Sequence, residues 1–243
     1  MSNTIGTFGG HVIGSGLLAR AFLLAPVETY RNACIYAAGV SNSSCTNVDE
    51  FKRERQRLVQ ALLEGEQADS FVYFGTCSVA DPETKDTPYV QHKLAMEILV
   101  SSHPRHLICR LPQVAGKTSN PHTLLNFLYT RIARSEAFTV WGSACRNIID
   151  VDDVVAIVQQ LIADPSMRGV TLNVANTCNY PITDIIHAME GALGKPSVYN
   201  IVNRGSAYTI DISVIALVLK QAAVCFGDDY LRAVMGKYYG RVE

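Results

Sequence analysis

The sequence has little charge and no excess of either sign. Only 18% of its 243 residues are charged, and 21 Lys and Arg residues against 22 Asp and Glu residues give a net charge of −1. Proteins that bind nucleic acid or anionic membranes usually present a basic surface, so neither partner is expected. Hydrophobic residues make up 48% of the chain, which is a globular composition. The length fits one domain, or one domain with a small appendage.

Long hydrophobic runs are lacking as well. One of the most apolar stretches, residues 212–223, contains Ser213 and Lys220. It falls short of the roughly 20 apolar residues that a membrane-spanning helix needs. The N-terminus has no basic segment followed by an apolar one, so we expect no secretory signal and a cytoplasmic protein.

Closely spaced cysteine pairs are also missing. The seven cysteines are scattered, and no two have the CxxC spacing. Neither a disulfide framework nor a metal site is therefore expected. We expect the thiols to be buried, because a reduced cysteine behaves as a small hydrophobic side chain.

Strand-like and helix-like segments alternate along the chain. Strands are expected at 11–13, 34–38, 71–74, 106–111 and 171–174, and helices at 17–24, 48–63, 89–101, 124–134, 153–163, 183–193 and from 212 onward. This alternation predicts an α/β fold in which helices cover both faces of a parallel sheet.

A glycine-rich turn joins the first strand to the first helix. Its pattern is Gly14-x-Gly16-x-x-Ala19. Gly14 permits a tight turn, Gly16 lets a pyrophosphate approach the backbone, and Ala19 permits close packing of helix on strand. The amides at the helix start would then bind the phosphates, although such turns also occur for packing alone.

Tyr89 and Lys93 are the next candidates. Residues four apart on a helix share one face, and a nearby ammonium lowers the pKa of a phenol. The pair follows a strand that ends in Thr76-Cys77-Ser78, whose hydroxyl groups could polarise a substrate carbonyl. A Tyr-x-x-x-Lys pair is common by chance, but its position after this strand favours a catalytic role.

The chain resembles the extended short-chain dehydrogenase/reductase family, which includes nucleotide-sugar epimerases, dehydratases and ketoreductases. The resemblance covers about residues 11–215. It rests on segments in the family's order: Val12–Ala19, Ile35–Gly39, Phe71–Val79, the Tyr89 and Lys93 pair, Arg110–Gly116 and Arg146–Val155. It implies a Rossmann-like, doubly wound parallel sheet with a small C-terminal substrate lobe.

The resemblance also implies the residues of the site. Catalysis is expected from Thr76, Tyr89 and Lys93. Cofactor contacts are expected from Gly14, Ser15, Gly16, Leu17, Leu18, Ala38, Gly39, Lys93, Pro112 and Val114, and substrate contacts from Cys77, Ser78, Gln113, Asn120 and Arg146. The cofactor would be NAD or NADP, with a slight preference for NAD. The substrate would be a nucleotide sugar, its diphosphate bound by Arg146, and a homodimer would form through the helices at 48–63 and 89–101.

The chain departs from the family pattern in its first half. The family places two strands and a helix between the first helix and the strand that ends in two alanines, whereas only residues 26–33 lie there in this chain. We therefore expect a sheet of five or six strands that lacks the family's second and third strands, which flank the adenosine. The expected regions are a shortened dinucleotide-binding part, 1–115, and a mixed part with the late strands and the substrate lobe, 116–243.

A second departure lies beside Thr76. The family's dehydratases have Asp-Glu directly after the catalytic threonine, and this chain has Cys77 and Ser78. Neither is a strong acid or base at neutral pH, so a 4,6-dehydratase is disfavoured. The charged run at 53–57 is interpreted as a solvated helix face, and His92 as a surface residue.

Three functions remain open at this point. The preferred one is a ketoreductase or epimerase of a nucleotide sugar. The second is a cofactor- or nucleotide-sugar-binding regulatory module with a degenerate cofactor site, and the third is a reductase of a carbonyl compound without a nucleotide. An Arg146 that is free in the cleft would favour a diphosphate, whereas pairing with Asp152 or Glu190 would not.

Overall fold

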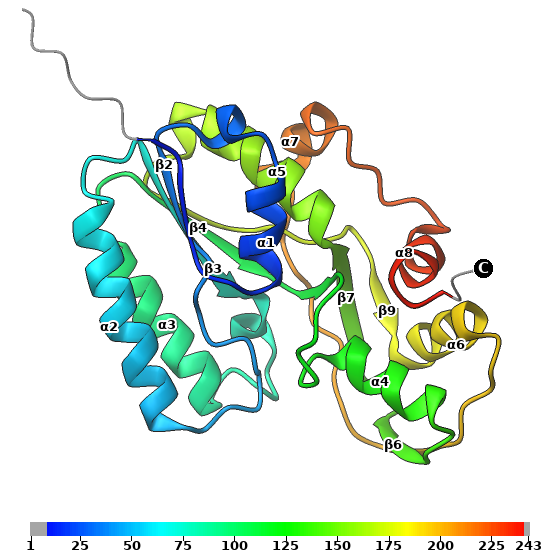
Figure 1. The fold of residues 1–243 in the computed structure, drawn as a ribbon. Coiled ribbons are helices and arrows are strands. Elements are labelled where there is room, and N and C mark those ends of the chain that lie inside the picture. The colour runs from blue at the N-terminus through cyan, green and yellow to red at the C-terminus, as the bar shows by residue number, and fades with distance from the viewer. Residues whose placement is uncertain (1–8, 241–243) are drawn as a thin grey trace, which may run out of the picture.

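The computed structural model describes residues 9–240, and a parallel sheet of five strands lies at its centre (Figure 1). In spatial order the strands are β1 (His11–Ile13), β2 (Ala33–Tyr36), β3 (Ser70–Thr76), β4 (His106–Leu111) and β8 (Val170–Asn173). All four pairings are parallel. The predicted Rossmann-like α/β fold is confirmed.

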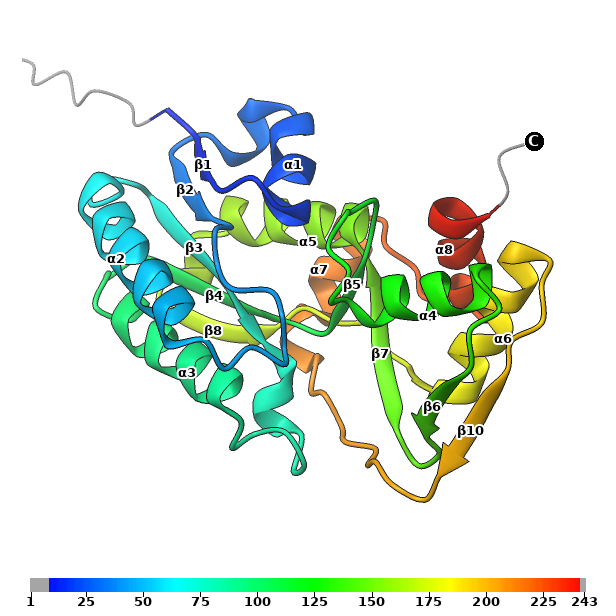
Figure 2. The same cartoon turned by 60° about the horizontal axis from the view of Figure 1, so that its bottom comes forward.

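Helices cover both faces of this sheet (Figures 1 and 2). The helices α2 (Val48–Glu64) and α3 (Pro88–Val100) lie on one face, and α1 (Leu17–Leu24), α5 (Val151–Ala163) and α7 (Ala216–Gln221) lie on the other. Side chains alternate along each strand. Cys34 and Tyr36 therefore enter the core under α2 and α3, and Ala33 and Ile35 enter the core under α1 and α5. Because both faces are covered, β2 is apolar along its whole length.

The described chain has no strand between α1 and β2. Residues Val27–Tyr30 form a 3-10 helix instead, and Thr29 Oγ1 accepts a hydrogen bond of 2.6 Å from Gln159 on α5. Strand β1 pairs directly with β2, with His11 opposite Cys34. Within residues 9–240, β1 is therefore an edge strand of the sheet, as the shortened first half predicted.

A second group of elements begins where β4 ends. Strands β5 (Gln113–Ala115), β7 (Cys145–Asp150) and β9 (Asn179–Pro181) form one small sheet, and β6 (Phe138–Trp141) pairs with β10 (Tyr199–Val202). Helices α4 (Leu124–Ala133), α6 (Ile182–Leu193) and α8 (Tyr230–Tyr239) pack around a separate hydrophobic core (Figure 2). Three further 3-10 helices span Cys77–Ala80, Pro165–Met167 and Ser213–Ile215.

The C-terminal tail is not one continuous helix, contrary to the expectation for the chain from residue 212. Helix α7 ends at Gln221, Ala223 has a positive φ of 53°, and α8 begins at Tyr230. Val218 packs into the core of the main sheet, whereas Val234 packs into the second core. The tail therefore contributes to both cores.

All seven cysteines lie within the described residues and are free thiols. Four are buried as expected, but Cys178 and Cys225 are exposed and Cys145 is half-buried, so the expectation is wrong for these three. In the part of the chain that the structure describes, no helix is both long and apolar enough to cross a membrane.

Candidate active site

The turn after β1 approaches β2 so closely that its first position requires glycine. Gly14 has a φ of +137°, and a β-carbon there would collide with the backbone of Ala37. A β-carbon on Gly16 would instead meet open space. Ala19 is fully buried, which agrees with close packing of α1 on the sheet.

Helix α1 begins at this turn without a side-chain cap. Gly16 is its N-cap, and no side chain accepts a hydrogen bond from the first amides. Those amides have no partners within the helix, and the helix dipole places positive charge there. The stretch from Gly14 to Leu18 lines a cavity of about 430 Å³. Uncapped helix N-termini of this kind are a common binding site for phosphate groups in proteins.

Strand β3 and helix α3 bring two hydroxyl groups to the same cavity. Thr76 ends β3, and its Oγ1 accepts a hydrogen bond of 3.1 Å from the backbone N–H of Ser78. Tyr89 lies in the first turn of α3, where Thr87 caps the helix. Thr76 and Tyr89 both line the cavity.

The pKa of Tyr89 is raised well above the usual value for a phenol. Burial is the largest cause and the negative charge of Glu54 adds to it, whereas the Thr76 side chain acts in the opposite direction. The expectation that Lys93 lowers this pKa is wrong for this structure. At neutral pH Tyr89 is therefore protonated and able to donate its proton.

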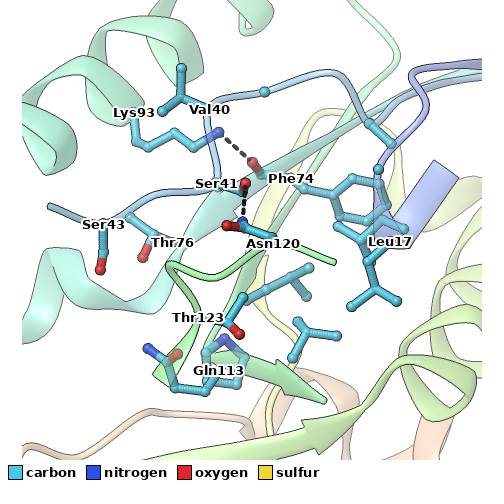
Figure 3. A pocket seen from close by; sticks show the side chains of 18 of the residues that line it. Leu17, Val40, Ser41, Ser43, Phe74, Thr76, Lys93, Gln113, Asn120 and Thr123 are labelled. Atoms are coloured by element: carbon cyan, nitrogen blue, oxygen red, sulfur yellow. Dashed lines mark hydrogen bonds between the residues drawn. The ribbon is translucent and has the colours of Figure 1, made fainter. Parts of the chain in front are cut away.

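The ammonium group of Lys93 has an acceptor for each of its three protons. Its Nζ lies 3.1 Å from the hydroxyl oxygen of Tyr73, 3.3 Å from the carbonyl oxygen of Phe74 and 3.3 Å from Oε1 of Glu54. The Lys93 side chain reaches across to β3 beside the cavity (Figure 3), and only 5% of it is exposed. Its charge is balanced within the protein by Glu54.

Glu54 lies in the charged run at 53–57, and the interpretation of that run as solvated is wrong for this residue. Its side chain is 1% exposed. Oε1 accepts hydrogen bonds from Tyr73 and Lys93, and Oε2 accepts one of 2.7 Å from the backbone N–H of Val40. Burial alone would raise the pKa of Glu54, but the hydrogen bond from His92 and the charge of Lys93 outweigh it and lower this pKa to about 2.

His92 was expected on the surface and is buried instead. Its Nε2 lies 2.9 Å from Oε2 of Glu54, and its ring stacks on Phe51 with centroids 4.3 Å apart. The residue therefore faces α2 rather than solvent. Its neighbour in sequence, Lys93, faces the cavity.

Nearly all the residues predicted for the site line this one cavity (Figure 3). They are Gly14, Ser15, Gly16, Leu17, Leu18, Ala38, Gly39, Thr76, Ser78, Tyr89, Lys93, Pro112, Gln113, Val114, Asn120 and Arg146. Cys77, expected to contact the substrate, is not among them. It is 1% exposed, its Sγ lies 3.2 Å from the carbonyl oxygen of Arg110, and burial raises the pKa of its thiol to about 12. Cys77 is a packing residue behind the site.

Arg146 enters the cavity from β7 without a carboxylate partner among the described residues. Its guanidinium donates a hydrogen bond of 2.8 Å to the neighbouring carbonyl of Cys145. Asp152 pairs with Lys237, and Glu190 accepts hydrogen bonds from Ser197. The arginine is thus available to an anionic group, which is the arrangement that favours a diphosphate.

Residues of the second group of elements also line the cavity. Nδ2 of Asn120 donates a hydrogen bond of 3.0 Å to Oγ of Ser41, which follows β2 (Figure 3). Tyr208, which sequence reasoning missed, lines the cavity from the segment after β10. Burial raises the pKa of Tyr208 to about 12. No sequence pattern marks this tyrosine, because it lies in an irregular segment.

Glu28, Arg31 and Arg20 are charged residues close to α1 that could favour NAD or NADP, but none of them lines the cavity. Glu28 and Arg31 lie 3.9 Å from each other on the 3-10 helix after α1, both largely exposed. Arg20 donates a hydrogen bond to the carbonyl oxygen of Lys117. A cation that the sequence did not single out, Arg57 on α2, does line the cavity.

Comparison with known families agrees with this geometry. The model of the NAD dependent epimerase/dehydratase family matches residues 25–175, more than half of the chain. The chain belongs to this family. The match begins after α1 and does not include the glycine turn at 14–19.

Solved structures of epimerases share the fold of this family member. UDP-glucuronic acid 4-epimerase from Bacillus cereus, in complex with UDP-glucuronic acid and NAD, aligns with a TM-score of 0.70 and 17% identity over 94% of this chain and 88% of its own. RMD from Pseudomonas aeruginosa, complexed with NADPH, aligns with a TM-score of 0.62 and 18% identity over 86% and 82%. None of the curated proteins matches the sequence.

Proposed function

We propose that this family member is an NAD- or NADP-dependent epimerase or 4-ketoreductase of a nucleotide sugar. One observation carries the proposal. One cavity is lined by Thr76, Tyr89 and Lys93. The glycine turn also lines it, as does Arg146, which has no carboxylate partner among the described residues. A phosphate-binding turn, a proton donor and a free cation are the three features that such a substrate and cofactor together require.

The residues of the first half fit a dinucleotide. The amides from Ser15 to Leu18 would bind its pyrophosphate, and the segment Ala38–Gly39 with Pro112 and Val114 would contact the nicotinamide half. The bound nicotinamide would supply the hydride acceptor and donor.

The chain's own groups would handle the proton. Tyr89 Oη would donate a proton to the substrate oxygen when a sugar carbonyl is reduced, and accept it when the alcohol is oxidised. The raised pKa of Tyr89 favours the protonated phenol, which can donate a proton, when no ligand is bound. Thr76 would donate a hydrogen bond to the same oxygen and stabilise its developing charge. Lys93, whose charge Glu54 balances, would contact the bound cofactor from the cavity wall.

The substrate class is argued from Arg146 and from the structural neighbours. The guanidinium has no carboxylate partner and forms part of the cavity wall, where it would bind a diphosphate. Neighbours with this fold were solved with UDP-glucuronic acid and with UDP-N-acetylmuramic acid. A 4,6-dehydratase stays disfavoured because Cys77 is buried and Ser78 is a weak acid. Cytoplasmic location and a homodimer through α2 and α3 remain predictions.

A second candidate is a binding module without turnover. It is favoured by the position of β1 at the edge of the described sheet, because the strands that flank adenosine in the family are missing there. Such a module would bind a nucleotide sugar without changing it.

Binding followed by product analysis separates the two candidates. NADH and NADPH are titrated by fluorescence. UDP-sugars are then incubated with the protein and NAD or NADP, and 4-keto sugars with the protein and NADH or NADPH, and the products are analysed by proton NMR. Conversion at C4 of a UDP-sugar, with or without consumption of NADPH or NADH, is the expected result. Sugar binding with no conversion by any cofactor would contradict the enzyme and favour the module.

A further inference from the structure

Glu54 is the most deeply buried carboxylate beside the proposed catalytic residues, and none of the steps above uses it. It lies on α2, with its side chain 1% exposed, and it contacts β3, α3 and the loop after β2. Burying a carboxylate is costly unless charge and hydrogen bonds compensate it, and here both of its oxygens are fully engaged.

The first oxygen of Glu54 holds the groups around the Lys93 ammonium. Oε1 accepts a hydrogen bond of 3.0 Å from the hydroxyl of Tyr73 and one of 3.3 Å from Lys93. Tyr73 in turn accepts from Lys93. The three groups form a closed triangle, which fixes the direction of the lysine side chain toward β3 (Figure 3).

The second oxygen holds the wall of the cavity. Oε2 accepts the backbone N–H of Val40 at 2.7 Å, and Val40 follows Ala38 and Gly39 in the segment that lines the cavity. Gly39 is confined by the same cluster, since a β-carbon there would lie 2.6 Å from Nζ of Lys93 and 2.9 Å from Oε1 of Glu54. The carboxylate thus connects the lysine to the backbone that would pass beneath the cofactor.

We propose that Glu54 is a positioning residue of this site, which fixes the Lys93 ammonium and the 38–40 segment relative to each other. Its negative charge also neutralises the lysine when no ligand is bound. The inference rests on the proposed function for what the site binds, but the coupling of Glu54 to Lys93 does not. Other charged groups nearby are His92 on the far side of Glu54, Arg57 one turn along α2, and Glu97, which is bonded to Arg110.

The chain offers a matched control for the loss of a buried carboxylate. Glu97 is also buried, on α3 one turn after Lys93, and Arg110 donates two hydrogen bonds to its Oε2, the shorter one 2.6 Å long. Glu97→Gln removes a buried charge without touching the Glu54 cluster. Any effect of Glu54→Gln that Glu97→Gln also shows is therefore a general effect of losing a buried carboxylate.

The first measurement is a stability cycle that needs no ligand. Urea unfolding is compared for the parent, Glu54→Gln, Lys93→Met and the double variant, and again with Glu97→Gln in place of Glu54→Gln. The double variant of Glu54 and Lys93 should lose less stability than the sum of the single losses, because neither charge is then left alone. Additive losses in that cycle would overturn the coupling. Should Glu54→Gln alone fail to fold, a folded double variant supports the coupling and an unfolded one overturns it.

The second measurement tests positioning. The dissociation constant of NADH is measured by fluorescence for folded Glu54→Gln and Glu97→Gln. About tenfold weaker binding is expected for Glu54→Gln, because the lysine and the 38–40 backbone lose their common anchor, and about twofold or less for Glu97→Gln. Equal affinities of the two variants would overturn the positioning role. If the parent itself binds neither NADH nor NADPH, the proposed function fails, while the stability cycle still decides the coupling.

Discussion

The ammonium nitrogen of Lys93 lies 3.1 Å from the hydroxyl oxygen of Tyr73, a residue of the central strand β3. The same hydroxyl donates its proton to Glu54. It therefore bridges the two charged groups of the cluster. A single phenylalanine substitution removes the bridge and leaves the charges in place.

Tyr73→Phe should lower the free energy of unfolding by about 1–3 kcal/mol, because two buried polar groups lose a partner. The ring itself stays packed against Tyr36, whose centroid is 6.1 Å away. Urea unfolding measures the loss. Tyr36→Phe is the control, since the Tyr36 hydroxyl donates a hydrogen bond of 3.2 Å to the backbone carbonyl of Glu54 instead of to its carboxylate. Equal losses of stability in the two variants would contradict the conclusion that the Tyr73 hydroxyl stabilises the protein by bridging Lys93 and Glu54.

Acid should remove the contribution of Glu54 to stability. Its pKa in the folded protein, about 2, lies below the ordinary value of 4.5. A lowered folded-state pKa stabilises the fold above the unfolded value and ceases to do so as pH falls through the folded value. The parent should therefore lose, between about pH 5 and pH 2, on the order of 3 kcal/mol that Glu54→Gln does not lose. Unfolding free energies of both proteins across this range test it, and parallel curves would contradict it.

Gly16→Val should abolish binding of NADH and NADPH. A β-carbon at this position would meet no protein atom within 4 Å, and the position lines the cavity at the start of α1, where the pyrophosphate is expected. The thermal midpoint should stay nearly unchanged. Gly191→Val is the control, because Gly191 lies on α6 with equally open space and outside the cavity. Undiminished nucleotide affinity in Gly16→Val would exclude the turn as the phosphate site.

Tyr89→Phe should lower turnover by about 10²–10⁴-fold, the usual contribution of general acid–base catalysis. Nucleotide-sugar binding should survive, since the ring and its packing remain. Steady-state kinetics with an active substrate and calorimetry with the same ligand separate the two effects. Turnover equal to that of the parent would remove Tyr89 from the proposed mechanism.

Arg146→Ala should weaken substrate binding more than it lowers turnover. A charge-assisted hydrogen bond to a phosphate contributes about 1.5–3 kcal/mol, so the affinity for a UDP-sugar should fall by about 10- to 100-fold. The turnover number should change less, because Arg146 is proposed to bind the diphosphate, whereas Thr76 and Tyr89 are proposed to contact the reacting oxygen. Affinity for UDP alone is the useful comparison: it should fall by a similar factor. An effect on the sugar and none on UDP would place Arg146 elsewhere in the site.

Local signals in the sequence predicted much of this fold. Helix α1 has the predicted bounds, and α2 is one residue longer than its periodicity indicated. The strands β6 and β10 were not predicted, because each has four residues and its partner lies about sixty residues away. The tail was predicted as one helix because its composition is apolar, and the break at Ala223 depends on packing against two different cores.

Some residues of the candidate site could likewise be predicted from local sequence patterns, whereas others depend on tertiary contacts. The phosphate turn and the Tyr89–Lys93 pair are close in sequence and carry recognisable spacing, so they could be found without a structure. Glu54 could not, because it stands between two arginines in a run that is typical of an exposed helix face. Its burial is favourable because, in the folded protein, His92 and Lys93 of α3 contact its carboxylate. Cys77 was predicted to contact the substrate because it follows Thr76 in sequence. Its side chain instead contacts the backbone carbonyl of Arg110, a contact that the sequence does not reveal.

The outer strand β1 has three residues, and within the described chain it pairs only with β2. A free sheet edge can recruit strands of other molecules, and natural proteins limit this hazard by keeping edge strands short. A template of three residues gives an incoming chain few hydrogen bonds. The shortened sheet therefore leaves β1 at an edge without creating an edge that promotes aggregation.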